Sequence, residues 1–249
     1  MGVGADLHAI VHRPMSIDYF DTFIWWSFVK AMTTAIIGVG HLGSALAQHL
    51  VRGREAVVLA AEDQSHAQQL AAQLGPLASA APVREAISQA DTVVLAVWLD
   101  KLKQLVGEQS DLLDGKVVVD PTNPVGFDEK GNFVRTLPEH QSSGSVVAEL
   151  LPPRAHYVKA FGTLGATSLA SSANRTPRRA ALFYATDDDQ AAATVERLIS
   201  AAGFDPVKAG GLQAAGRIET PGGDLQESGL GRLVDADEAR AAIVAGTVA

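Results

Sequence analysis

The sequence predicts an α/β fold in which helices cover both faces of a doubly wound, mostly parallel sheet. The chain has 249 residues, enough for one large buried core, and 47% of them are hydrophobic. Short runs rich in Val, Ile and Leu alternate with stretches whose apolar residues recur at helical spacing. Continuous apolar runs are typical of strands buried on both faces, and right-handed crossovers join such strands in parallel. The alternation therefore predicts repeated βαβ units.

The elements follow one another from residue 33. TTAIIG (33–38) is a strand, HLGSALAQHLVRG (41–53) is a helix closed by glycine, EAVVLAA (55–61) is a second strand, and DQSHAQQLAAQLG (63–75) is a second helix. Later apolar runs predict strands at 91–98, 116–120, 157–163 and 180–186. A helix with an acidic first turn is expected at 187–203, followed by an edge strand at 204–210.

The chain divides into three predicted parts: an N-terminal extension (1–31), a dinucleotide-binding domain (32–210) and a C-terminal strap or arm (211–249) with a helical stretch at 235–245. The aromatic segment 17–31 contains Asp18, Asp21 and Lys30, so it falls short of the roughly 20 apolar residues of a membrane span. Two interpretations of the extension remain open. It is either the product of too early a start codon, since Met32 directly precedes the first strand, or a docking segment that uses Phe20, Phe23, Trp25 and Trp26.

Composition excludes several functions. The net charge of −8 disfavours nucleic acid and anionic membranes as partners. There is no cysteine, so thiolate catalysis and disulfides are excluded, and a reducing cytoplasm is the expected location. The seven histidines lack the spacing of metal ligands, so no metal site is expected.

The most informative motif is GVGHLG, which places Gly38, Gly40 and Gly43 in G-x-G-x-x-G spacing between a predicted strand and a predicted helix. The first glycine permits a tight turn, the second lets a pyrophosphate approach the backbone, and the third lets the helix pack closely on the strand. A helix N-terminus favours an anion at this position. The motif predicts a Rossmann-type dinucleotide site at the whole loop, which comprises Gly38, Val39, Gly40, His41, Leu42 and Gly43.

The end of the second strand bears on which dinucleotide is bound. Glu62 and Asp63 stand where an acid would bind the adenosine ribose, and no Arg or Lys follows closely in the sequence. A carboxylate repels a 2′-phosphate, so these residues favour NAD. Asp63 is equally suited to cap the following helix, which leaves Glu62 as the predicted ribose ligand.

Further candidates stand where other strands end, because ligands bind outside the carboxyl ends of the strands in such sheets. Val97 and Trp98 follow one strand, Asn123 lies between two prolines after the next, and Thr163 follows another. Trp98 would form a wall of the nucleotide site or a rim aromatic. Asn123 would present its amide to a nicotinamide or serve as a turn residue.

Catalytic side chains are less evident. Hydride transfer between two planar rings needs alignment and exclusion of water more than an acid or base. A carbonyl or imine substrate would need a proton donor, and the candidates are His140, Ser143 and Lys159. The alternatives are that Lys159 extends from a strand towards solvent and that His140 belongs to a polar loop.

An ordered set of motifs resembles the coenzyme F420-dependent NADP oxidoreductase family, to which the reductase domain of metalloreductases is related. The motifs are IGVGHLGSALAQHL, DPTNP, SGSVVAELLP, YVKAFGT, DDDQAAATVERLISAAGFDPVKAGGL and AGRIE, within residues 33 to about 220. The resemblance implies a compact Rossmann domain, NADP as cofactor, hydride exchange with a flavin-like ring and, often, a homodimer.

The chain departs from that family's pattern at several positions. The family carries Ser and Arg for the 2′-phosphate after the second strand, whereas this chain has Ala60, Ala61 and Glu62. The usual asparagine of the KAFNT motif is Gly162, and the acid expected after the serine of SGSVV is Val146. The second substrate is therefore left open between a deazaflavin, another flavin, a quinone and a small carbonyl or imine.

The sequence thus predicts an NAD(P)-dependent oxidoreductase acting on a small-molecule redox partner. A non-catalytic NAD(P)-sensing regulatory protein is the alternative, because the fold alone does not distinguish the two. A hydroxy-acid dehydrogenase or pyrroline-carboxylate reductase would need a long helical domain after the dinucleotide-binding part, and only about forty residues follow Gly210.

Overall fold

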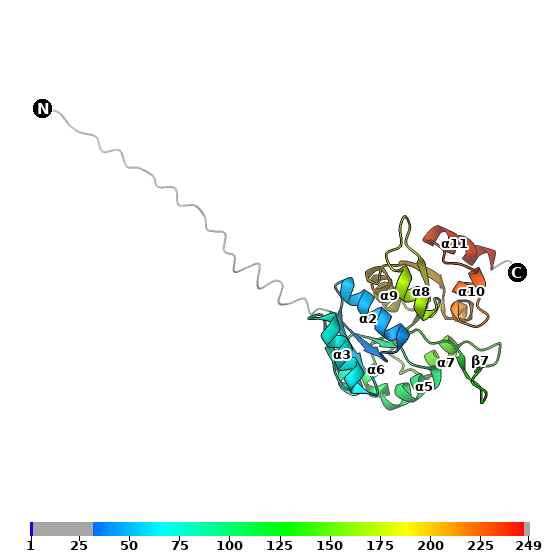
Figure 1. Ribbon diagram of the computed structural model, residues 1–249, viewed down its shortest axis with the longest axis horizontal. Helices are drawn as coiled ribbons and strands as arrows, with labels where there is room; N and C mark the ends of the chain where they lie inside the picture. The colour runs from blue at the N-terminus through cyan, green and yellow to red at the C-terminus, as the bar shows by residue number, and fades with distance from the viewer. Residues whose placement is uncertain (2–31, 247–249) are drawn as a thin grey trace. The chain divides into compact units, whose positions relative to one another are not determined.

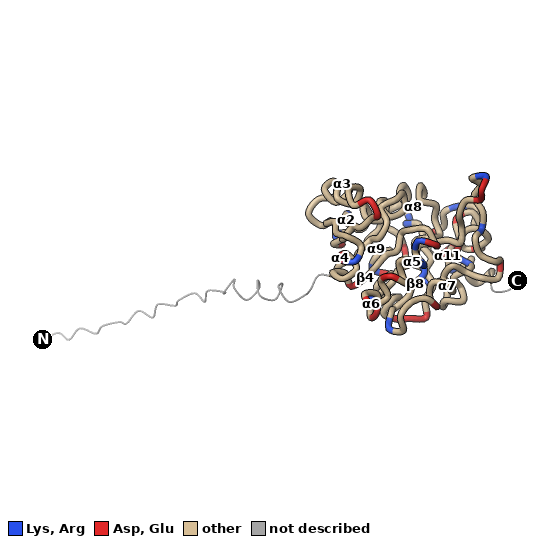
Figure 2. Tube along the Cα trace, turned by 90° about the horizontal axis from the view of Figure 1, so that it is seen from below, with Lys and Arg blue, Asp and Glu red and all other residues tan. Residues whose placement is uncertain are grey.

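The computed structural model describes Met1 and residues 32–246 (Figure 1). The predicted N-terminal extension, with its docking alternative, lies outside the described residues apart from Met1. Within the described part of the chain, no helix is long and apolar enough to cross a bilayer. Acidic and basic residues are interspersed along the described trace (Figure 2), so positive charge is not concentrated on one element.

An eight-stranded sheet forms the centre of the molecule, and it confirms the predicted α/β fold class. Its strand order is β10-β9-β8-β5-β4-β1-β2-β3. All neighbours pair in parallel except β8 and β9. The strands are β1 (Thr33–Ile37), β2 (Ala56–Ala60), β3 (Ala78–Ala80), β4 (Thr92–Leu95), β5 (Val117–Asp120), β8 (His156–Ala160), β9 (Ala181–Ala185) and β10 (Asp205–Gly210).

Helices cover both faces of this sheet because successive strand residues point to opposite sides. Ile36 packs into one core with residues of α2, α3, α8 and α9, whereas Ile37 packs into another with residues of α4, α5 and α7. The helices are α2 (His41–Arg52), α3 (Gln64–Leu74), α4 (Val83–Gln89), α5 (Leu99–Glu108), α6 (Ser110–Leu113), α7 (Ser143–Leu150), α8 (Ala166–Ser172) and α9 (Asp189–Ala201).

Two smaller features shape the edge of the sheet where the parallel strands end. A hairpin of β6 (Val125–Phe127) and β7 (Phe133–Arg135) projects after β5. After Gly210 the chain forms η1 (Leu212–Ile218), α10 (Glu227–Leu230) and α11 (Ala236–Ala245), which pack on β9 and β10 through a third apolar core. The division of the chain at residues 31 and 210 stays a prediction.

Candidate functional site

A cavity of about 500 Å³ lies beside the carboxyl ends of β1, β4, β5 and β8. This is the edge at which ligands bind in doubly wound sheets. The loops that follow these strands supply most of its lining. Six of the residues predicted from the sequence line it together: Gly40, His41, Leu42, Val97, Trp98 and Asn123.

The glycine loop after β1 has the tight geometry that its spacing predicts. Gly38 has a φ of +102°, and a Cβ added there would clash with the carbonyl oxygen of Ala96. A Cβ on Gly43 would clash with the carbonyl oxygen of Gly38. By contrast, a Cβ on Gly40 would meet no protein atom within 4 Å. The backbone at Gly40 is therefore open to an approaching ligand.

The N-terminus of α2 has the features of an anion-binding site. Gly40 is its N-cap and has no side chain to satisfy the first N–H groups, and the first turn contains no acidic residue. The hydroxyl of Ser44 donates to the carbonyl oxygen of Val39 at 2.6 Å and fixes the loop from behind. Unsatisfied N–H groups, the helix dipole and the open space at Gly40 together fit the pyrophosphate of a dinucleotide.

Two exposed carboxylates, those of Glu62 and Asp63, follow the end of β2. Asp63 is the N-cap of α3 and accepts from the backbone N–H and the hydroxyl of Ser65, and these bonds lower the pKa of its carboxyl. Glu62 is free of this capping role, and its side chain is 88% exposed. Its Oε1 lies 3.9 Å from Nζ of Lys101 on α5. The contact with Lys101 could not be predicted from the sequence, because the two residues come from different βα units.

Three exposed aromatic rings form the rim of the cavity, and we call them the aromatic rim: Trp98, Phe127 and Phe133. Their exposed fractions are 57%, 64% and 55%, respectively. The ring of Phe127 lies between the other two, edge to face, with both centroid distances 5.8 Å. Trp98 and Phe133 line the cavity itself, so Phe127 extends the aromatic surface outward from it.

Asn123 holds the backbone together at the far side of the cavity. Its Nδ2 donates to the carbonyl oxygen of Gly162 at 3.0 Å, and its Oδ1 accepts from the N–H of Thr220 at 2.8 Å. A Cβ on Gly162 would lie 2.7 Å from the carbonyl oxygen of Pro121, so the chain is too tightly packed here for a larger residue. Asn123 thus shapes the cavity, and one of its two amide hydrogens remains for a ligand.

Thr163 is the one predicted residue of this region with an unsatisfied side chain. Its hydroxyl oxygen is buried and has no hydrogen-bond partner among the residues described. Gly162 and Leu164 on either side of it line the cavity, whereas Thr163 itself does not. The side chain of Thr163 is therefore buried next to the cavity lining formed by Gly162 and Leu164.

Two of the predicted proton donors belong to a buried polar network. Nζ of Lys159 donates to Oγ of Ser143 at 2.7 Å and to Oδ2 of Asp120 at 3.0 Å. Tyr157 donates its hydroxyl to the same Asp120 oxygen, and burial, reinforced by that carboxylate, raises the pKa of the phenol. Lys159 therefore does not extend to solvent as the alternative interpretation proposed.

The carboxylate of Glu219 completes this network. It accepts from the backbone N–H groups of Ser143 and Gly144 at 2.9 and 2.8 Å, and its Oε1 lies 3.5 Å from Nζ of Lys159. Nζ of Lys159 also lies 3.4 Å from Oγ1 of Thr122, which lines the cavity. The network is thus separated from the cavity by one threonine.

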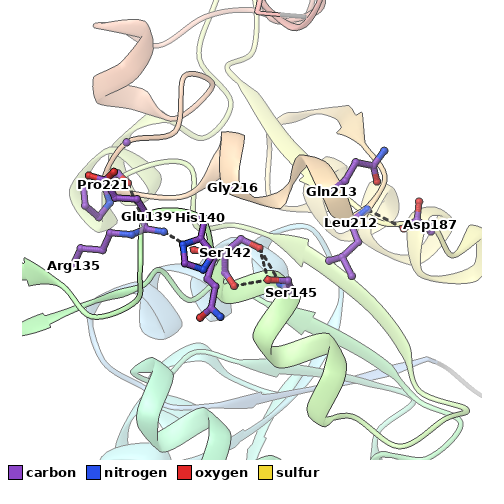
Figure 3. A pocket seen from close by; sticks show the side chains of 12 residues that line it. Arg135, Glu139, His140, Ser142, Ser145, Asp187, Leu212, Gln213, Gly216 and Pro221 are labelled. Carbon is purple, nitrogen blue, oxygen red and sulfur yellow. Dashed lines mark hydrogen bonds between the residues drawn. The ribbon is translucent and has the colours of Figure 1, made fainter.

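His140 lies in a different place. It lines a second cavity of about 1040 Å³ between the loop after β7, the start of α7 and η1 (Figure 3). Figure 3 shows His140 and Arg135 on one side of this cavity and Gln213 and Asp187 on the other. Arg135 donates to the carbonyl oxygens of Leu137, Pro138, Gln141 and Pro221. The structure therefore brings Ser143 and Lys159 together but not His140.

No group of three or more His, Cys, Asp or Glu residues in the described part of the chain is arranged to hold a metal ion. The site offers backbone N–H groups and apolar walls. A mostly parallel sheet with a tight glycine loop and an open helix N-terminus defines a Rossmann-type dinucleotide-binding domain.

Comparison with known proteins identifies the family. Residues 33–124 match the model of the family described as NADP oxidoreductase coenzyme F420-dependent. A hypothetical protein from Sinorhizobium meliloti, known from its crystal structure, is 33% identical in sequence to this chain. The two structures align with a TM-score of 0.70 over 79% of this chain and 94% of that one. The chain belongs to the coenzyme F420-dependent NADP oxidoreductase family.

Two further proteins are more distantly similar. The metalloreductase STEAP3 of Rattus norvegicus is 28% identical over 190 residues, which is 76% of this chain. The chain spans about a third of that relative's length, 36%. A protein from Arthrobacter sp. FB24 assigned as an F420-dependent NADP reductase is 22% identical, with a TM-score of 0.64, over 74% of this chain and 87% of that one.

The same fold occurs in a reductive aminase from Aspergillus terreus, solved in complex with NADPH and ethyl levulinate. It is 18% identical, with a TM-score of 0.56, over 75% of this chain and 58% of that one. At this identity the likeness concerns the fold.

Proposed function

We propose that the protein is an oxidoreductase that passes a hydride between a nicotinamide nucleotide and a flat, conjugated acceptor of flavin or deazaflavin type. The observation that carries this proposal is the placement of the aromatic rim on the same cavity as the glycine loop. When bound, the reduced nicotinamide supplies the hydride, and the acceptor takes up that hydride and one proton.

The chain's own residues would have three tasks. The N–H groups at Gly40 and His41 would hold the pyrophosphate. Asn123 and the backbone around Gly162 would shape the far wall, and the aromatic rim would align a flat ring and exclude water from one side of it. The NADPH-bound relative of the same fold and the family match support nicotinamide as the cofactor.

The placement of the proton donors favours a flavin-type acceptor over a carbonyl or imine. A carbonyl substrate needs a donor within hydrogen-bond reach in the cavity. His140 lines the other cavity, while Ser143 and Lys159 are buried behind Thr122. A flavin-type ring reaching out over Phe127, 64% exposed, would take its proton from solvent instead.

A homodimer in the cytoplasm remains our expectation for the assembly and its location.

The proposal is tested by fluorescence titration with NADH and NADPH, followed by hydride-transfer assays against a deazaflavin, FMN and a panel of carbonyls. We expect nucleotide binding and turnover on a flavin-type acceptor. Binding without turnover on any acceptor would favour the sensor, and turnover on carbonyls alone would overturn our choice of acceptor.

A substitution in the aromatic rim makes this test specific. Phe127→Ser removes an exposed ring that does not line the cavity, so folding and nucleotide affinity should be unchanged. Loss of one ring contact of about 1 kcal/mol should raise KM for the acceptor about fivefold. Leu150→Ser, at an exposed apolar position on α7, is the control and should leave KM unchanged. An equal KM for both variants would argue against the aromatic rim.

A further inference from the structure

The pair formed by Glu62 and Lys101 has no function in the fold that we can identify. Glu62 follows β2, and Lys101 lies in the first turn of α5. Their charged groups are 3.9 Å apart, and the side chains are 88% and 40% exposed, respectively. An exposed ion pair at this distance contributes little to stability, because water and salt screen it. Either partner can therefore exchange the other for a ligand at small cost.

The position of the pair links it to the proposed nucleotide site. Trp98, the N-cap of α5, and Leu99, its first residue, line the cavity, so Lys101 projects from the helix that borders it. Glu62 stands at the end of β2, the point at which the adenosine ribose lies in dinucleotide-binding sheets. Asp63 is committed to the N-terminus of α3 through Ser65. Glu62 and Lys101 are thus the charged groups available to the ribose here.

We propose that Lys101 is the specificity-determining residue that lets this site accept a nucleotide with a 2′-phosphate. The proposal rests on the proposed function. A 2′-phosphate adds about two negative charges at pH 7, which Glu62 alone would repel. The ammonium of Lys101 offsets that repulsion and donates to the 2′-phosphate. When the nucleotide has no 2′-phosphate, Glu62 instead accepts a hydrogen bond from its free 2′-hydroxyl. The pair replaces the Ser and Arg that the chain lacks after β2.

The test compares dissociation constants for NADPH and NADH by fluorescence titration, which needs no acceptor and no turnover. Wild type should bind both nucleotides with comparable affinity. Lys101→Met should weaken NADPH binding about tenfold, because it removes a charge-assisted hydrogen bond and leaves Glu62 facing the phosphate, with little change for NADH. Glu62→Gln should shift the ratio the opposite way, towards NADPH.

Lys103→Met is the matched control, because Lys103 lies on the same helix and pairs with Asp100 rather than with Glu62. It removes the same charge from α5 and should leave the ratio unchanged. The inference is wrong if Lys101→Met changes both affinities equally, if Lys103→Met has the same effect, or if wild type binds NADH alone. Absence of binding to either nucleotide would instead overturn the proposed function itself.

Discussion

His49 illustrates how the environment of one residue fixes its protonation state. It lies on α2 three residues after Leu46, Leu50 lies four residues after Leu46, and all three are buried. Its Nε2 lies 3.0 Å from the carbonyl oxygen of Leu169, so the imidazole joins α2 to α8. Burial lowers the pKa of His49 below its ordinary 6.5, despite the opposing effect of that carbonyl. In the folded protein the ring is therefore neutral at pH 7.

This shift predicts a loss of stability in mild acid. A group whose pKa is lower in the folded state binds more protons when unfolded, so its contribution is present above pH 6.5 and declines as the pH falls through the folded pKa. We expect the free energy of unfolding, measured by urea denaturation, to fall as the pH is lowered below 6.5. His49→Gln should flatten this part of the profile. An unchanged profile in the variant would assign the effect to other groups.

Some residues of the site could be predicted from the sequence, and others could not. Gly38, Gly40 and Gly43 could be predicted because each meets a backbone requirement that spacing reveals, and the structure gives each the expected environment. The placement of Lys101 beside Glu62 could not be predicted, because the two residues belong to different βα units. The place of Lys159 in a buried network was equally hidden, because its partner Glu219 comes from the segment after η1.

At the scale of elements, carboxylates from the C-terminal segment hold the starts of two helices. Glu219 accepts from N–H groups at the N-terminus of α7, and Glu227 accepts from the N–H of Gly165, the N-cap of α8. Gly165 itself lines the cavity. The C-terminal segment therefore fixes walls of the site rather than lying loosely against it.

Removing Glu219 should consequently destabilise the whole domain. Glu219→Ala removes the acceptor of two N–H groups at the start of α7 and leaves Lys159 with one buried carboxylate fewer, so we expect a loss of about 3 kcal/mol in the free energy of unfolding. Urea denaturation measures it. Glu149→Ala, at an exposed position on the same helix, is the control and should change stability by less than about 0.5 kcal/mol. Equal effects of the two substitutions would contradict the capping role.

The same scale shows where prediction from the sequence succeeds and fails. The central strands are continuous apolar runs, so β1, β2, β4 and β5 could be located within a few residues. The hairpin of β6 and β7 carries no such signal, because its residues alternate irregularly and Phe127 and Phe133 remain exposed. Its importance appears only when the fold brings it to the rim of the cavity.

At the scale of the whole molecule, we expect the edge formed by the carboxyl ends of β1, β4, β5 and β8 to bind a nicotinamide nucleotide. The fold class followed from the order of elements, because alternating strands and helices leave few topologies. The identity of the hydride acceptor did not follow, since it depends on surfaces assembled from loops. The family match and the geometry of the glycine loop converge on the same edge.

The most direct test is a fluorescence titration of wild type and Gly40→Asp with NADPH. A Cβ at Gly40 meets no protein atom, and aspartate is a favourable N-cap, so the variant should fold with unchanged or higher Tm. Its carboxylate would occupy the proposed pyrophosphate position and engage the N–H groups of α2. We predict saturable binding by wild type and at least about a tenfold loss in the variant. Equal affinity in both proteins, or no saturable binding by wild type, would contradict nucleotide binding at this edge of the sheet.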